Sequence, residues 1–345
     1  MKKVLTAIAF LAALASCTVD NTVQEGQPAH LRVGVKYAAS VKGSVSGTDD
    51  EKSVHSLQVF VFRMSQGKYI LEASVKEDSG TAGLTVTTGQ KHVLVLANEP
   101  ADYSDAVSRD AILEKVSRLK DNAPDSFVMI GEADCLVSSL ENTLAVPVDR
   151  MASRVKIHKI TNKLRNGFAS KDVKVSRVFL TGAGASATYS AKGNTSGFYA
   201  TSGINGSLDL DGTQVGSDEK TSVNALIYKE VLSGIIPEEG SYTAPVSLYA
   251  YPNDGSANAT QLTVEMEIGG KYYTYPIVLP AMGRNCTCEV TELVLSSLGN
   301  ASNGDDSMDP GEDNPISFMA ASFNVSVSPW TEVNVSNGED GKYTI

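Results

Sequence analysis

The stretch LTVEMEIGGKYYTYPIVL, residues 262–279, decides the fold class of this chain. In its first half, apolar side chains alternate with polar ones, which is the period of a β-strand that has one face on a core. Gly269 and Gly270 then favour the positive φ angles of a tight hairpin, and the chain returns as a second strand. Further strands are expected at residues 31–37, 54–62, 93–97, 144–148, 173–180, 246–251 and 323–327.

Other segments depart from this period. Ile112, Val116 and Leu119 recur at helical spacing, which predicts one amphipathic helix between residues 103 and 122. Residues 38–53 and 182–222 are rich in small and polar side chains, and we expect long surface loops there. Many short strands joined by turns rich in Gly, Ser and Asn indicate an all-β protein of β-sandwiches, and the length of 345 residues suggests two domains.

The first residues carry an export signal. Lys2 and Lys3 precede an apolar run at residues 4–14, which is too short to cross a membrane and predicts a signal peptide over residues 1–16. The run ends in LASC, residues 14–17, a pattern that predicts cleavage before Cys17 and attachment of lipid to its thiol. An ordinary signal peptide with an incidental cysteine is the alternative. The predicted product is an exported lipoprotein that acts outside the cytoplasm.

The charge and the cysteines argue against a nucleic-acid-binding protein and against a fold held by disulfides. The net charge of −11 and the lack of a Lys/Arg-rich run argue against nucleic acid as a partner. Cys135, Cys286 and Cys288 cannot all pair, and the last two lie on one strand in positions that are poorly placed to bridge each other. Free thiols are expected; a metal site on two cysteines is the alternative, but no Cys/His cluster supplies the other ligands.

No catalytic motif is present. The sequence lacks HExxH, GxSxG and a phosphate-binding glycine loop, and its four histidines are scattered singly. The acidic runs Asp49-Asp50-Glu51 and Asp305-Asp306 could hold calcium but do not follow EF-hand spacing, and we expect them to be solvated charges of loops. We therefore predict a protein that is not an enzyme, with no catalytic residue, metal or cofactor; a cell-envelope hydrolase is kept as the third alternative.

Four features together resemble the fimbrillin family of Bacteroidales, the FimA-type major fimbrial subunits of type V pili. They are the lipoprotein signal, GTDDEKSVHSLQVFVF at residues 47–62, RMASRVKIHKI at residues 150–160, and GRNCTCEVTELVL at residues 283–295 followed by a polar linker and a last strand ending in SPW at residues 328–330. Each feature alone is a weak indication of the family. Their order and spacing along nearly the whole chain make the resemblance specific.

The resemblance implies two tandem transthyretin-like β-sandwich domains and a strand-exchange mechanism. In the family, a protease cuts the loop after the first strand, and a strand from another subunit fills the groove that is left. The implied division is a lipidated segment at residues 17–53 with the removable strand and the cleavage loop, an N-terminal domain at 54–149, and a C-terminal domain at 150–345 with a donor segment at about 316–345.

The implied site residues follow from this division. The removable strand carries Leu31, Val33 and Val35. The donor strand carries Phe323, Val325, Val327 and Trp330. Arginine is typical at the family's cut, but Lys42 before Gly43 aligns best here, so a trypsin-like processing protease is expected instead of a strictly arginine-specific one.

The resemblance implies a structural subunit of a cell-surface fimbrium that supports adhesion. Its partners would be copies of itself, other fimbrial subunits, the processing protease and, before cleavage, the outer membrane. One alternative is a fimbrial anchor or accessory protein that stays uncleaved. Another is a lipid-anchored glycan-binding protein, for which Tyr272, Tyr273 and Tyr275 form the only aromatic cluster. Ordinary edge strands within one domain are the alternative to a donor and its groove.

Overall fold

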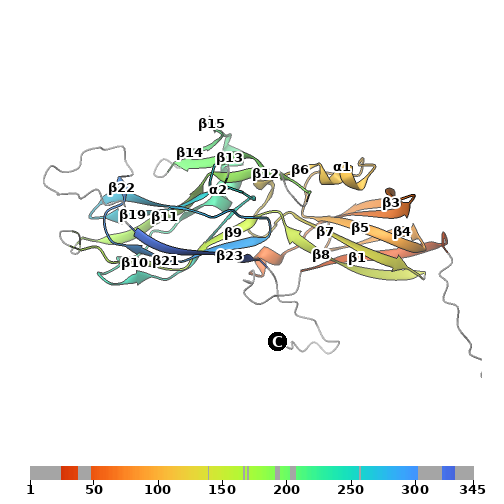
Figure 1. The fold of residues 1–345 in the computed structure, drawn as a ribbon, viewed down its shortest axis with the longest axis horizontal. Helices are drawn as coiled ribbons and strands as arrows, with labels where there is room; N and C mark the ends of the chain where they lie inside the picture. The colour runs from red at the N-terminus through yellow and green to blue at the C-terminus, as the bar shows by residue number, and fades with distance from the viewer. Residues whose placement is uncertain are drawn as a thin grey trace, which may run out of the picture.

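The structure is a computed structural model of the chain. It describes residues 25–37, 48–138, 140–165, 168, 171–190, 195–202, 207–255, 258–301 and 321–330. These residues form an elongated all-β molecule with two units end to end along its long axis (Figure 1). The predicted fold class is confirmed.

The first unit is built on one seven-stranded sheet, in the order β3-β2-β5-β7-β8-β1-β4. Its strands are β1 (Pro28–Tyr37), β2 (Leu57–Ser65), β3 (Lys68–Glu77), β4 (Thr81–Thr87), β5 (Gly89–Ala97), β7 (Met129–Val137) and β8 (Glu141–Arg150). The end strands β3 and β4 are joined by Glu72, whose carboxylate accepts hydrogen bonds from the backbone and hydroxyl of Thr87 at 2.5 and 2.8 Å. The sheet therefore curls around its own core.

Three further sheets make up the second unit and the junction. One contains β9 (Ser153–Ile157), β10 (Ile160–Asn162), β17 (Ser241–Tyr242), β18 (Val246–Ala250), β21 (Cys286–Leu295) and β23 (Ala321–Pro329). A second contains β11 (Val173–Thr181), β16 (Tyr228–Glu230), β19 (Gln261–Ile268), β20 (Lys271–Val278) and β22 (Asn300–Ala301). The third contains β6 (Val116–Arg118), β12 (Ala183–Thr188), β13 (Thr195–Ser202), β14 (Ser207–Leu210) and β15 (Thr213–Gln214).

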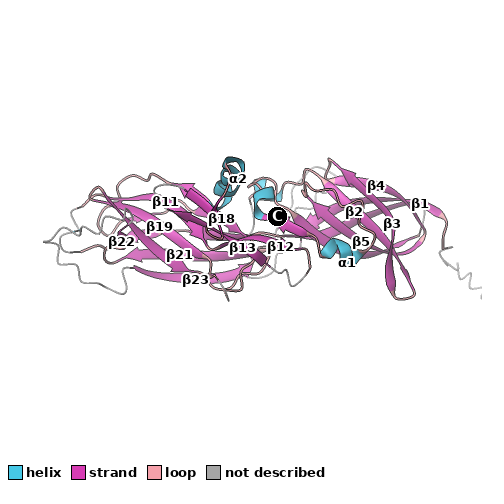
Figure 2. Ribbon diagram, turned by 90° about the horizontal axis from the view of Figure 1, so that it is seen from above, coloured by secondary structure: helices cyan, strands magenta, loops and turns pink. Residues whose placement is uncertain are grey.

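The two units share the third sheet. β6 comes from the chain of the first unit, yet it pairs antiparallel with β12 of the second. Beside this pairing, the buried hydroxyl of Tyr251 lies 2.6 Å from that of Ser117 and accepts a hydrogen bond from Asn122 at 2.9 Å. Backbone pairing and buried polar contacts therefore fix the junction. Figure 2 shows β12 and β13 at this place, between the two units.

The hairpin that decided the fold class forms as predicted. β19 and β20 pair from Gln261 and Val278 to the turn, where Gly269 and Gly270 adopt φ angles of 58° and 81°. Part of the predicted polar face of β19 is also buried, however. Glu265 is fully buried because Arg177 of β11 approaches it at 2.7 Å, so an ion pair replaces the solvent that alternation alone would suggest.

Two predictions of local structure were wrong in part. The helix between residues 103 and 122 is limited to α1 (Arg109–Leu113), followed by β6 and the short 3-10 helix η2 (Leu119–Asp121). The segment 182–222 contains β12, β13, β14 and β15 and the start of α2 (Ser217–Ile227) rather than loops alone. Small side chains hide the two-residue period there, and pairing with neighbouring strands overrides their weak strand propensity. Within the described residues, no helix has the length and apolar composition to cross a membrane.

Gly131 gives a stability test of the sheet. A β-carbon at this position would collide with the carbonyl oxygen of Pro147 on β8, so Gly131→Ala must move one strand. We expect Gly131→Ala to lower the free energy of unfolding by about 1–3 kcal/mol in urea titrations. Gly234→Ala is the matched control, because a β-carbon there meets no atom within 4 Å. Equal stability of the two variants would contradict this packing.

Candidate assembly site

The strand predicted to be removable lies inside the first sheet. β1 pairs antiparallel with β4 and parallel with β8. Leu31 and Val33 are fully buried, and Val35 packs against the core while partly exposed. Burying one such side chain stabilises a fold by about 1.5–3 kcal/mol. β1 is therefore tightly held, and its loss would uncover an apolar trough and the backbone edges of β4 and β8.

The strand predicted to be the donor is held differently. β23 pairs antiparallel with β21 of its own chain over its whole length. Its apolar side chains are poorly covered, since Phe323 is 43% exposed, Val327 is 42% exposed and Val325 is partly buried. Within the described part of the chain, no strand pairs with the other edge of β23. The pairing with β21, and not the burial of its own side chains, thus holds this strand within the sheet.

The predicted lipidation and cleavage positions, Cys17, Lys42 and Gly43, lie outside the described residues. The described residues that flank the predicted cleavage loop are Tyr37, at the end of β1, and Thr48. The hydroxyl of Tyr37 donates a hydrogen bond to the backbone carbonyl of Lys52, at the end of the 3-10 helix η1 (Asp50–Lys52). The two sides of the loop are thus in direct contact.

Trp330, which directly follows β23, is completely buried between the two units. The guanidinium carbons of Arg150 and Arg154 lie 4.2 and 4.7 Å from the centre of its ring. Phe127 and Tyr249 complete the surroundings, with ring centres 5.5 and 5.9 Å from the indole. A desolvated cation–π contact is worth about 2 kcal/mol, so the two arginines hold this ring firmly.

Glu51 balances the charge of these arginines. Its carboxylate accepts hydrogen bonds from Arg154 at 2.8 Å and from the Tyr249 hydroxyl at 2.7 Å. Its backbone carbonyl accepts two more from Arg150, at 3.1 and 2.9 Å. We call Glu51, Arg150 and Arg154 the arginine clamp. Burial acts to raise the pKa of Glu51, but the charge of Arg154 and the hydrogen bonds outweigh it and hold the pKa below its usual value.

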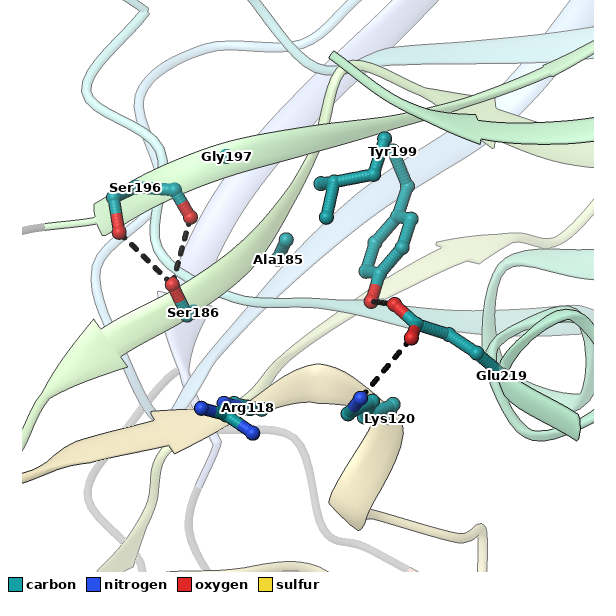
Figure 3. Close-up of a pocket in the computed structure, with 9 residues that line it drawn as sticks. Arg118, Lys120, Ala185, Ser186, Ser196, Gly197, Tyr199 and Glu219 are labelled. Carbon is teal, nitrogen blue, oxygen red and sulfur yellow. Dashed lines mark hydrogen bonds and ion pairs between the residues drawn. The ribbon is translucent and has the colours of Figure 1, made fainter. Parts of the chain in front are cut away.

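A separate hollow of about 340 Å³ opens beside β6, β12 and β13 (Figure 3). Small residues on the strands leave this space, among them Ala185 and Gly197. Glu219 accepts hydrogen bonds from the Tyr199 hydroxyl at 2.6 Å and from Lys120 at 3.0 Å. The guanidinium of Arg118 lines the hollow and forms no hydrogen bond or ion pair with a described residue, although its charge acts on the nearby carboxylates of Asp121 and Glu219.

The tyrosine cluster does not form one aromatic platform. Tyr272 alternates with Tyr273 and Tyr275 along β20, so it projects from the opposite face. Tyr275 is buried and its hydroxyl donates to the carbonyl of Ser297 at 2.9 Å. These contacts fit packing within the sheet.

The three cysteines within the described residues are free thiols. Burial raises the pKa of Cys288 to about 12, so this thiol is protonated at neutral pH. Among the described residues, no group of three or more His, Cys, Asp or Glu is placed to hold a metal ion.

The arginine clamp itself was missed by the sequence reasoning. Two of the segments that carried the family resemblance contain Glu51 and the arginine pair, but no role was predicted for the arginines. The prediction that Glu51 is a solvated loop charge was wrong, because its side chain is 2% exposed and pairs with Arg154. The sequence feature that could have indicated the clamp is the pair Arg150 and Arg154, which lie on either side of a turn, at the buried ends of two strands. Such charges need a partner, but sequence does not show which of the chain's 40 acidic residues supplies it.

Comparison with known proteins agrees with this architecture. Residues 29–139 match a family model described as "Major fimbrial subunit protein (FimA)". A comparison with curated proteins finds no match.

Three solved structures show the same fold. One, of a proposed cell adhesion protein from Bacteroides eggerthii, is 16% identical with a TM-score of 0.65, covering 90% of this chain and 98% of that one. Another, from Parabacteroides distasonis, is 16% identical with a TM-score of 0.60, covering 90% and 99%. A fimbrilin (FimA) from Porphyromonas gingivalis is 11% identical with a TM-score of 0.53, covering 90% and 99%.

The fold and the family match give the class of protein that this chain resembles: residues 29–139 match the FimA major fimbrial subunit model, and the chain shares the fold of the Porphyromonas gingivalis fimbrilin. The resemblance to the fimbrillin family predicted from the sequence is confirmed, by the family match in the N-terminal part and by the shared fold over most of the chain.

Glu51→Gln tests the arginine clamp through its pH dependence. Because the folded-state pKa of Glu51 is lowered, its ionised form stabilises the fold above the usual glutamate pKa, and this contribution is lost as the pH falls through the folded-state pKa. At neutral pH we expect Glu51→Gln to cost about 3 kcal/mol in urea unfolding, with a shallower loss of stability in acid than the unmodified protein shows.

Glu239→Gln is the control for this measurement. Glu239 pairs with Arg165 at the surface, where both side chains are more than half exposed, so the change should cost less than about 1 kcal/mol. A Glu51→Gln variant as stable as this control would show that the clamp does not stabilise the fold.

Proposed function

We propose that the chain is a polymerising subunit of a surface fimbrium, matured by proteolysis and assembled by strand exchange. It is exported as a lipoprotein with lipid on Cys17 and is anchored in the outer membrane. A trypsin-like protease cuts between Lys42 and Gly43, and β1 leaves. The tail strand of another copy, with Phe323, Val325 and Val327, then fills the groove. This proposal keeps the predicted division at residues 17–53, 54–149 and 150–345.

The observation that carries the proposal is the contrast between two strands. β1 buries Leu31 and Val33 completely, whereas β23 leaves Phe323 and Val327 nearly half exposed in its own chain. Both strands place apolar side chains at every second residue, which is what one groove requires of its occupant. Moving a half-exposed apolar side chain into a groove gains roughly 1 kcal/mol, so exchange improves the burial of β23.

The groove also explains why exchange would lead to long polymers. An open backbone edge between β4 and β8 needs hydrogen-bond partners, and a strand from a second copy supplies them along its length. Each subunit would then offer one groove and one tail. Such a head-to-tail contact continues without closing, as fibres require.

The test of the proposal is assembly of purified protein after cleavage of the loop. We expect the cut chain to form an SDS-resistant ladder, and we expect Val327→Asp to prevent it, because a charge cannot enter an apolar groove. Ser326→Asp is the matched control, since residue 326 projects from the other face of β23. A ladder that persists after deletion of residues 316–345 would contradict the proposal.

The mature N-terminus separates a stalk subunit from an anchor. Protein recovered from surface polymers should begin at Gly43. An intact lipidated Cys17 in the polymer would reject the stalk role and favour the uncleaved anchor or accessory protein.

The hollow beside β6 favours a second candidate function, the binding of an acidic sugar. Arg118 offers two parallel N–H donors to a carboxylate, and the hydroxyls of Ser186 and Ser196 at the hollow could bond to a sugar. The volume of about 340 Å³ suits one monosaccharide. The alternative of a glycan-binding surface protein therefore rests on Arg118 and not on the tyrosine cluster.

Glucuronate is the probe for this second function. Saturation-transfer NMR should detect glucuronate but not neutral glucose, and Arg118→Gln should abolish the signal. Arg63→Gln, which removes an exposed arginine of β2, is the control. Equal signals from glucuronate with both variants would exclude the hollow as its site.

A further inference from the structure

The arginine clamp touches both the cleavage loop and the tail. On the side before the loop, the Tyr37 ring lies 5.1 Å from the guanidinium of Arg150. After the loop, Thr48 and Glu51 hydrogen-bond reciprocally, as the Thr48 backbone donates to the Glu51 carboxylate at 2.5 Å and the Glu51 backbone donates to the Thr48 hydroxyl at 3.3 Å. The clamp is thus supported by residues on each side of the predicted cut.

Trp330 is the anchor of the tail in this closed arrangement. Within residues 321–330, only the Trp330 side chain is buried, and it lies against Arg150 and Arg154. The indole N–H has no hydrogen-bond partner among the described groups, which is unfavourable while the ring stays buried. The contacts of the Trp330 ring with the clamp therefore outweigh the cost of the unpaired indole N–H. Water would satisfy this N–H if the ring became exposed.

We propose that the arginine clamp is an autoinhibitory lock, which keeps the tail strand in its own sheet until the loop is cut. The inference rests on the proposed strand exchange and adds its regulation. With the loop intact, Tyr37 and η1 support the clamp, Trp330 stays bound, and β23 is not available as a donor. Loss of β1 after the cut removes Tyr37, frees Trp330 and makes β23 available.

The contacts give the order of events. When the segment up to Lys42 leaves, the guanidinium of Arg150 loses the Tyr37 ring and the carbonyl of Lys52 loses its hydrogen-bond donor. The turn from Thr48 to Lys52 then lies only a few residues from a new chain end, so its hold on the clamp weakens. One cut thereby opens a groove and releases a donor on the same molecule, and uncut precursors do not polymerise.

Trp330 is the only tryptophan of the chain, so its fluorescence reports the lock directly. In the uncut, full-length protein, Tyr37→Ala should shift the emission to longer wavelength and increase quenching by acrylamide several-fold. Hydrogen exchange of the β23 amides should rise in the same variant. Tyr69→Ala is the matched control, because the Tyr69 ring packs on Arg109 at 5.6 Å in a similar contact on β3. Unchanged quenching in Tyr37→Ala would overturn the lock.

Cutting tests the lock and the proposed function separately. A variant with a specific protease site in place of residues 39–45 is cut, and acrylamide quenching and the SDS-resistant ladder are followed together. We expect quenching to rise as the segment before the cut is lost. A ladder with unchanged quenching of Trp330 would overturn the lock but leave strand exchange standing. Increased quenching without a ladder would support the lock and reject strand exchange.

Discussion

The ion pair between Glu51 and Arg154 is the contact on which the middle of this molecule depends. Both side chains are 2% exposed, and charges at such depth are tolerated only when each has a close partner of opposite sign. The pair joins the segment that precedes β2 to β9 of the second unit. Around it, Arg150, Tyr249 and Trp330 fill the space between the two cores. The junction is therefore specified by charge and ring geometry as well as by apolar burial.

The same architecture explains why β1 is held more firmly in its sheet than β23 is. β1 lies between two partners and buries its apolar side, whereas β23 has one partner and little cover. An edge strand with exposed apolar side chains is normally a liability, which proteins limit with charge, short length or a cover. Here the adjoining residue, Trp330, is fixed in the interior, so the exposed edge is restrained by its end and not by its own side chains.

Sequence pattern predicted the strands with clear alternation and the glycine hairpin after Ile268, because burial of one face leaves a direct mark on residue order. It failed where side chains are small, as at Gly184 and Ala185 of β12, since such residues fit a strand or a loop equally well. It placed the two strands of interest correctly as strands. It could not find the clamp, because the contact between Glu51 and Arg154 joins residues more than a hundred positions apart, and periodicity carries no information about such a distance.

The sheet shared by the two units has a mechanical consequence. β6 leaves the first unit to pair with Ser186, Ala187 and Thr188 of β12, so the two halves are linked by a hydrogen-bonded ladder besides the covalent chain. A pull along the long axis must break that ladder, strip Tyr251 from its buried partners and separate the central charges at nearly the same moment. In a fibre of the proposed kind, each repeat would therefore behave as a stiff rod, and extension under flow would be concentrated at the joints between neighbouring copies.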